Sequence, residues 1–240
     1  QAPQPLAPRR QDRPGEALGE ERDPAVIAHL RAELNLDAPI PVQYFHWLTR
    51  ALQGDLGVSL RTQEPVTHLI AAKLPVTLEM SLLAMIIALL VGISMGILAA
   101  VNKNSWIDHG TNFVAISGIS VPHFWLGILL ILIFSVNLQW LPASGFVPFA
   151  EDPLQNLRTL LLPSLVLGTG LAATLMRHTR ASMIAVLKAD YIRTARAKGL
   201  LPKAVIMKHA FRNALVPVIT LTTLLFGELL GGAVLTEQVF

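Results

Sequence analysis

Two ionisable side chains lie inside long apolar stretches of the chain, where they could contact a polar solute. Glu228 lies in the mostly apolar segment 213–236, and His123 lies in the segment 111–138, which has no Asp, Glu, Lys or Arg. An acidic side chain in the middle of a bilayer costs roughly 3 kcal/mol on insertion scales and commonly marks a functional site. For Glu228 we favour packing, against a partner subunit or a wet cavity, because nothing nearby in the sequence names a ligand; a functional site is the alternative.

Pro122 and His123 interrupt the segment 111–138 and admit two interpretations. A broken helix at membrane depth can line a pathway. We prefer a simple proline kink, with the His123 ring hydrogen-bonded to the backbone. The histidines show no H-E-x-x-H or other ligand spacing, so the sequence predicts no metal site. No Ser, His and Asp can be combined into a catalytic arrangement from their spacing, and we expect a chain that is not an enzyme.

A third group of candidate functional residues is positively charged. The segment 177–212 holds nine of the nineteen Lys and Arg residues and a single acid, Asp190. Apolar residues recur there at spacings of three and four, which predicts one face of a helix: Ile184, Leu187, Tyr191 and Ala195. Gly199 is expected to stop that helix, and a second helical stretch after Pro202 leads to Pro217. A nucleic acid or a lipid surface could bind such a segment, but beside long apolar stretches a cytoplasmic loop is the interpretation we favour.

The elements that position these residues are membrane helices. Hydrophobic residues make up 52% of the 240 and charged residues only 15%, against about a quarter in soluble domains. Apolar stretches of about 20 residues cross a bilayer as helices, and such continuous stretches do not match barrel strands. Four predicted spans follow: 78–101, 111–138, 159–176 and 213–236. The sequence therefore predicts an all-α, polytopic transmembrane protein, and the absence of cysteine excludes disulfides and thiolate metal sites.

The basic segment also predicts the orientation. Short loops rich in Lys and Arg stay in the cytoplasm, so 177–212 and 102–110 are expected inside and 139–158 outside. The region 23–75 is then extracytoplasmic, and 76–240 forms the membrane domain. Because a hydrophilic region of this size cannot cross unaided, we expect a spanning helix or a signal before it.

The N-terminal residues divide at Asp23. Residues 1–22 hold four prolines and few large apolar side chains, a composition typical of disorder. Short helices are expected over 24–36, 42–53 and 66–74, with Gly54 to Gly57 breaking the second and Pro75 ending the third. These helices make 23–75 a small helical region.

Glycine pairs mark two of the predicted spans. Gly92 and Gly96 are four residues apart, as are Gly227 and Gly231. Small residues at this spacing let two membrane helices approach closely. We expect both pairs to lie at helix–helix contacts, although such spacings are common.

The cationic segment resembles a known motif. Residues Asp190 to Gly199, read as DYIRTARAKG, and His209 to Leu215, followed by Pro217, are similar to the cytoplasmic "EAA" loop of permeases in ATP-binding-cassette importers. The branch that serves dipeptides, oligopeptides, glutathione and nickel is the most similar. The resemblance runs from about residue 15 to the end and includes further pieces in order: Leu36-Asp37, Pro41 to Tyr44, Trp47-Leu48, Gly54 to Gly57, Ser59, Gly118, Ser120, Pro122, Phe124 to Leu126, Leu141-Pro142, Arg177, Arg180, Met183, Gly231 to Val234, Glu237 and Phe240.

The resemblance implies roles for individual residues. The short helix of the loop would dock into a groove on an ATPase, with Ala195 allowing close approach and Gly199 the turn. The implied coupling residues are Asp190, Tyr191, Arg193, Thr194, Ala195, Arg196, Ala197, Lys198 and Gly199. The residues implied to support the loop are His209, Arg212, Asn213 and Pro217. Our candidates for the pathway or for helix packing are Pro122, His123, Glu228 and Gly231.

The resemblance also implies partners. These are a second homologous permease subunit, two cytoplasmic ATPases, an extracytoplasmic solute-binding protein and membrane lipid, but no nucleic acid. The sequence has no G-x-x-x-x-G-K-[ST] phosphate-binding loop, so we expect no cofactor in this chain and ATP and Mg²⁺ on the separate ATPase. The complex is expected in the bacterial inner membrane.

Two departures from the general pattern narrow the assignment. Arg193, Thr194 and Ala195 stand where the loop usually opens Glu-Ala-Ala, and His209 to Arg212 replace a later Ile-x-Leu-Pro. Both replacements are typical of the peptide branch. The family usually has six spanning helices, and we expect four here, without the first and the last.

We predict import of di- or oligopeptides, with nickel, glutathione or another small solute as alternatives. An ion-coupled transporter that uses Glu228 as a proton carrier is a different class, and an intramembrane hydrolase is disfavoured because no nucleophile is paired with a base.

Overall fold

The computed structural model describes residue 31 and residues 37–59, 62–232, 236 and 239–240. In these residues all regular structure is helical, apart from one isolated bridge between Val58 and Pro65. The predicted all-α fold class is therefore confirmed. The predicted disordered segment 1–22 lies outside the described residues, as does the helix predicted at 24–36 except for Arg31.

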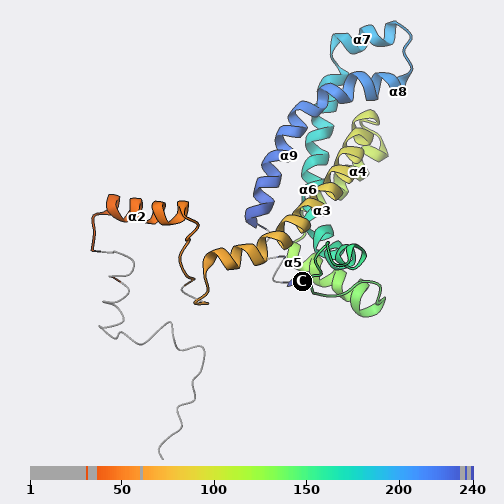
Figure 1. The fold of residues 1–240 in the computed structure, drawn as a ribbon. Helices are drawn as coiled ribbons and strands as arrows, with labels where there is room; N and C mark the ends of the chain where they lie inside the picture. The colour runs from red at the N-terminus through yellow and green to blue at the C-terminus, as the bar shows by residue number, and fades with distance from the viewer. Residues whose placement is uncertain (1–30, 32–36, 60–61, 233–235, 237–238) are drawn as a thin grey trace, which may run out of the picture. The chain divides into compact units, whose positions relative to one another are not determined.

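The chain forms two compact units, residues 1–69 and 70–240. The first contains α2, which spans Ile40–Leu52 and has no buried residue (Figure 1). These bounds lie close to those of the predicted helix 42–53. Gly54 and Gly57 follow with φ angles of +86° and +80°, so the predicted break is confirmed.

Arg50 closes the turn after α2. Its guanidinium lies 2.7 Å from the Asp55 carboxylate, which also accepts a hydrogen bond of 2.9 Å from the Gly57 backbone N–H. The Gly57 N–H, and after it the Arg50 guanidinium, hold the pKa of the Asp55 carboxyl below its ordinary value. Because all these groups are solvent-exposed, the contact fixes the shape of the turn and adds little stability.

The second unit is a helical bundle (Figure 1). Its elements in chain order are α3 (Val66–Val101, which begins at the end of the first unit), α4 (Trp106–Ser120), α5 (His123–Leu130), the π-helical η1 (Ile131–Asn137), α6 (Pro153–Leu187), α7 (Asp190–Ala197), α8 (Pro202–Ala204), the π-helical η2 (Val205–Phe211) and α9 (Arg212–Gly232).

These helices account for the predicted spans. Three of them, α3, α6 and the continuous stretch Pro202–Gly231, are long and apolar enough to cross a membrane. The remaining predicted span, 111–138, corresponds to α4 together with α5 and η1, and the two halves of this pair meet at an angle of 99°. The four apolar stretches of the sequence thus become three long helices and one bent pair.

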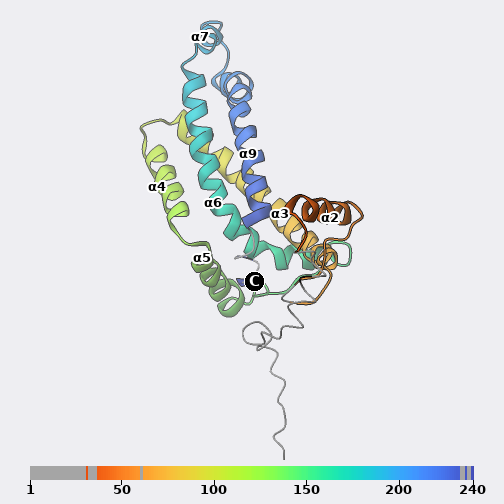
Figure 2. The same ribbon diagram turned by 90° about the vertical axis from the view of Figure 1, so that its left-hand side faces the viewer.

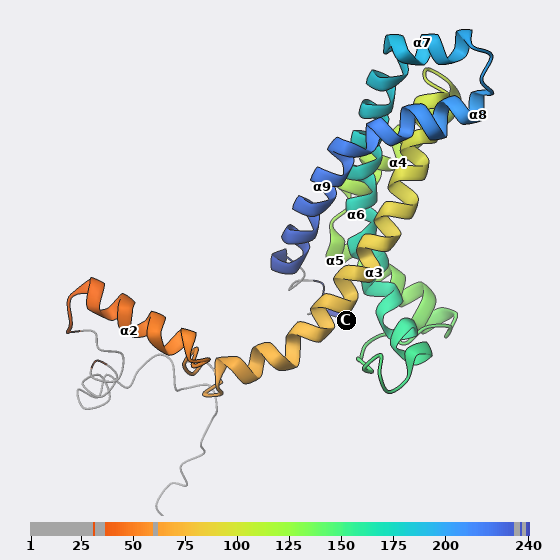
Figure 3. The same cartoon turned by 45° about the horizontal axis from the view of Figure 1, so that its top comes forward.

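Within this unit α6 lies against α4, α5 and α9 (Figure 2). The connection from α3 to α4 lies toward the same end of the bundle as α7, and α5 lies toward the other end (Figures 2 and 3). This arrangement places the expected inner segments, 102–110 and 177–212, at one end of the bundle.

The prediction that a helix ends at Pro75 is wrong. The helix α3 runs without interruption from Val66 to Val101, with Pro75 inside it. A proline inside a helix removes one backbone hydrogen bond without forcing the helix to end, and the long apolar stretch that follows favours a continuous helix. The apolar residues beyond Pro75 therefore extend the helix.

The predicted single helix through Ile184 and Ala195 is also wrong. The helix α6 continues to Leu187, the chain extends at Ala189 with ψ 147°, and α7 begins at Asp190. A straight helix would carry Ile192 and Ala195 away from the bundle. The break turns α7 so that both side chains are buried.

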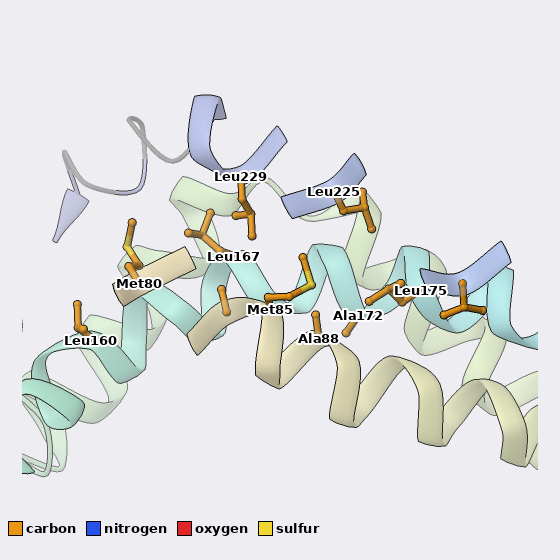
Figure 4. Packing of buried hydrophobic residues seen from close by; sticks show 11 residues of the cluster. Met80, Met85, Ala88, Leu160, Leu167, Ala172, Leu175, Leu225 and Leu229 are labelled. Atoms are coloured by element: carbon orange, nitrogen blue, oxygen red, sulfur yellow. The ribbon is translucent and has the colours of Figure 1, made fainter. Parts of the chain in front are cut away.

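The main core lies between α3, α6 and α9. Figure 4 shows side chains from the three helices meeting along α6. The buried residues are Met80, Ala84, Met85, Ala88, Leu160, Leu167, Ala172, Leu175, Val218, Leu225 and Leu229. Several are alanines, so the backbones can approach closely.

The first glycine pair lies at such an approach, as predicted. A Cβ on Gly92 would lie 2.7 Å from the Ala172 carbonyl oxygen, and one on Gly96 would lie 2.6 Å from the Cβ of Thr179. By contrast, Gly227 and Gly231 have open space where a Cβ would lie. The second pair is therefore not at a contact within the described part of this chain.

We expect Gly96→Ala to lower the stability of the protein by about 1–2 kcal/mol, because the new methyl group would overlap α6 in a packed contact. Thermal unfolding in detergent would measure the change. The matched control is Gly110→Ala in α4, where a Cβ meets nothing within 4 Å and alanine favours the helix. If both variants unfold at the wild-type temperature, α3 and α6 do not approach each other at Gly96 as closely as described.

Candidate functional site

The helix α7 is attached to the bundle by one face. Ile192 is fully buried and Ala195 is 6% exposed. They share a cluster with side chains of α3, α6, η2 and α9: Ala100, Met183, Val205, Ala210 and Ala214. The small side chain of Ala195 thus allows α7 to approach its own chain closely.

The other residues of the proposed coupling set are exposed. They are Asp190, Tyr191, Arg193, Thr194, Arg196, Ala197, Lys198 and Gly199. Asp190 and Arg193 form an ion pair of 3.5 Å on the surface. Gly199 follows with φ +77°, so the chain turns sharply after α7.

Two leucines that sequence analysis did not single out extend this surface. Leu200 is 40% and Leu201 74% exposed, and Tyr191 on α7 is 44% exposed. Large apolar side chains among cations are typical of a surface that another protein covers. The signal in the sequence was a pair of leucines after Gly199 in an otherwise cationic stretch.

The residues expected to support the loop lie where η2 joins α9. The Asn213 side chain donates a hydrogen bond of 2.8 Å to the His209 carbonyl oxygen, and Arg212 lies between them at the start of α9. Pro217 lies one turn later inside α9, which continues past it. The chain therefore stays helical from Pro202 through the membrane segment.

A buried ion pair near the α7 end was not predicted. The Arg180 guanidinium on α6 donates hydrogen bonds of 2.6 and 2.7 Å to the two carboxylate oxygens of Asp108 on α4. Asp108 is 1% exposed and also accepts from the Asn104 backbone N–H and the Asn112 side chain, each at 2.9 Å. This network joins the start of α4 to α6. The sequence marked Arg180 only as part of the family resemblance, and nothing in it linked Arg180 to Asp108.

A cavity of about 290 Å³ lies in the bundle between the bent pair, α6 and α9. It is lined by Ile119, His123, Leu167, Gly170, Leu171, Thr174, Leu225, Glu228 and Leu229. The structure thus brings together His123 and Glu228, which sequence analysis had considered separately. Pro122 precedes His123 at the break, and Gly231 lies nearly one turn beyond Glu228 with open space beside it.

The preferred interpretation of His123, a simple kink with a hydrogen-bonded ring, is wrong. The helix breaks fully at Val121-Pro122, and α5 leaves at 99° to α4. In the described residues the His123 ring has no hydrogen bond and packs on α6, where a Cβ on Gly170 would lie 2.7 Å from its Nε2 atom. The broken helix therefore places His123 at the cavity.

The described residues also contain no group of three His, Asp or Glu side chains placed to hold a metal.

Asp108→Ala should destabilise the protein by about 3 kcal/mol, because it leaves the Arg180 guanidinium without its buried partner. The matched control is Asp190→Ala, since the Asp190–Arg193 pair is largely exposed and its loss should hardly change the melting temperature. Thermal unfolding in detergent compares the two. Equal effects of the two substitutions would contradict a special role for the buried pair.

Comparison with known proteins agrees with this architecture. Residues 92–240 match the family described as "Binding-protein-dependent transport system inner membrane component", and residues 7–81 match "Binding-prot-dependent transport system membrane comp, N-term". A "Putative peptide transport system permease protein" of Brucella abortus is 46% identical over 222 residues, covering 92% of this chain and 71% of the relative.

Two further relatives are named glutathione transport system permease protein GsiC. That of Pectobacterium atrosepticum is 47% identical over 224 residues, which cover 93% of this chain and 71% of the relative. That of Salmonella typhi is 46% identical over 222 residues, which cover 92% of this chain and 70% of the relative. Both the family match and these identities extend over the bundle that carries α7 and the cavity. The chain therefore belongs to the family of inner membrane components of binding-protein-dependent transport systems, as a multi-pass membrane protein.

Proposed function

We propose that this chain is a permease subunit of an ATP-binding-cassette importer and forms part of the pathway for small peptides. The proposal rests on how α7 is packed: it contacts the bundle through Ile192 and Ala195 and exposes its opposite face. A helix held in this way can transmit a displacement, because packed interiors are nearly incompressible. The solute class comes from the relatives, which are named for peptide and glutathione transport.

The exposed face of α7 is the proposed docking surface for a cytoplasmic ATPase. Tyr191, Leu200 and Leu201 supply apolar area, and Arg193 and Arg196 supply charge. Tyrosine and arginine are enriched in protein–protein interfaces, and exposed leucines beside them are typical of such a surface. ATP and Mg²⁺ would be bound by the ATPase.

The complete complex would contain a second, similar permease subunit, two ATPases and an extracytoplasmic solute-binding protein. We place the segment 177–212 in the cytoplasm, because it holds most of the cations of the membrane unit. The segment 139–158 and the region 23–75 then lie outside. Residues 102–110 share the cytoplasmic end, which agrees with their position toward the α7 end of the bundle (Figure 3).

Gly199→Val should lower ATP-driven uptake by about tenfold or more while the amount of inserted protein stays the same. At φ +77° a β-branched side chain is strained, so the turn would shift Leu200 and Leu201 away from α7. Asparagine tolerates this conformation, so Gly199→Asn should keep most of the activity. Uptake of a labelled dipeptide by the complete complex measures both variants. Normal uptake by the valine variant would refute α7 as the coupling helix.

Single cysteines can test the orientation, since this chain has none of its own. A membrane-impermeant maleimide should label Glu151→Cys in cells with an intact inner membrane. It should label Arg193→Cys only after that membrane is broken, because α7 lies at the opposite end of the bundle. Labelling of Arg193→Cys alone from outside would mean that the topology is inverted and that no cytoplasmic ATPase can reach α7.

A further inference from the structure

Glu228 has no compensating charge in the part of the chain that the structure describes. Its carboxylate makes no ion pair or hydrogen bond there, although α9 is an apolar helix. The neighbouring side chains on the cavity side are Leu225 and Leu229, which are 8% and 6% exposed. A carboxylate beside apolar side chains in a membrane helix is energetically costly unless a cation pairs with it.

Three side chains that can accept hydrogen bonds line the cavity, each from a different helix. They are the Glu228 carboxylate on α9, the Thr174 hydroxyl on α6 and a ring nitrogen of His123 on α5. The Thr174 hydroxyl donates to the Gly170 carbonyl at 3.2 Å, so its lone pairs remain available to accept. A neutral imidazole also has one acceptor nitrogen. Among the residues that the structure describes, no Lys or Arg lines the cavity.

An ammonium group matches this set, because it carries one positive charge and three N–H donors. We infer that the cavity between α5, α6 and α9 binds the ammonium group of the transported solute, with Glu228 as the counter-charge. This inference rests on the proposed import of peptides, whose free amino terminus is such a group.

The size of the cavity supports binding of one end of the solute. Its volume of about 290 Å³ is at the lower limit for small-molecule sites, which are usually 300–1,000 Å³. The buried side chains of Leu225 and Leu229 beside Glu228 lower the local polarity and so strengthen the attraction between charges. Two features give the cavity its depth: the break that turns α5, and Gly170, whose missing side chain leaves room for the His123 ring.

The alternative is that Glu228 pairs with a cation of the second permease subunit. Glu228 and His123 are both exposed on this chain, so a partner subunit can reach the carboxylate. A pair with the partner alone, however, would not need the acceptor side chains of His123 and Thr174, which line the same cavity from two other elements. The solute is therefore the occupant that the cavity favours.

The test uses Leu171→Cys in the complete transporter, because Leu171 lines the cavity without being one of the three acceptors. Cationic and anionic methanethiosulfonate reagents of similar size are applied, and the mass of this chain reports the reaction. With Glu228 present, the ratio of cationic to anionic rates should exceed that of Glu228→Gln by about fivefold. Glu228→Asp should keep the preference.

Protection by solute then identifies the ammonium group. A dipeptide with a free amino terminus should slow labelling of Leu171→Cys, its N-acetylated form should not, and Glu228→Gln should abolish the protection. The matched control is Val114→Cys, beside a separate cavity of about 160 Å³ whose lining has no ionisable side chain. Its labelling should not respond to Glu228→Gln or to either peptide.

Three outcomes would overturn the inference: no labelling of Leu171→Cys, no charge preference, or equal protection by the two peptides. An absent charge preference is also the result expected if Glu228 pairs with the partner subunit. Labelling needs neither ATP nor the binding protein, so ATP-driven uptake is measured separately on the unsubstituted complex. Uptake without a charge preference would reject the ammonium site alone, and a preference without uptake would reject the proposed importer.

Discussion

Close packing on α6 is the constraint on which the rest of the bundle depends. Small residues let α3 lie against its middle, where even one methyl group on Gly92 would overlap a backbone carbonyl. Polar contacts hold both ends of the helix. The Asp108–Arg180 ion pair joins α6 to α4 near the α7 end, and the Asn156 side chain reaches Glu79 of α3 near the other. Because unpaired polar groups in an apolar environment are costly, these contacts define where α6 can lie.

The spans could be predicted from the sequence because length and apolarity alone decide which segments cross a bilayer. The positions at which the helices begin and end could not be predicted in this way. A proline often marks a helix boundary, yet α3 continues through Pro75, because losing one backbone hydrogen bond does not force a long apolar helix to end. The break at Ala189 was missed for a different reason. The spacing of Ile184 and Ala195 fits one straight helix, and only tertiary packing shows that Ile192 must turn back to be buried.

The candidate site was predictable in its parts but not in its assembly. Glu228 and His123 each stood out as polar residues in apolar segments, but 105 positions separate them in the sequence and no pattern joins them. The 99° bend and the packing of α9 on α6 bring them to one cavity. The ion pair between Asp108 and Arg180 could not be predicted from the sequence, because a charge near the end of a span is normally solvated. Tertiary contact alone gives such residues their role.

The two candidate sites lie on the same pair of elements, and this limits how motion can pass between them. The cluster under α7 includes Met183 of α6 and Ala214 of α9, whereas the cavity includes Thr174 of α6 and Glu228 of α9. Under the proposed function, a displacement of α7 therefore acts on both helices at once. If they moved as one body, the spacing of Thr174 and Glu228 would stay constant and the cavity would not respond.

A relative movement of α6 and α9 requires compliance in one of them between the two sites. Pro217 lies inside α9 between Ala214 and Glu228, and an internal proline removes one backbone hydrogen bond of the helix. By comparison α6 is α-helical throughout and held by Arg180 close to the cluster. The more deformable path is thus the one into α9, so a push on α7 would move Glu228 with respect to an α6 that stays in place. An importer that holds its solute through Glu228 would release it by that movement.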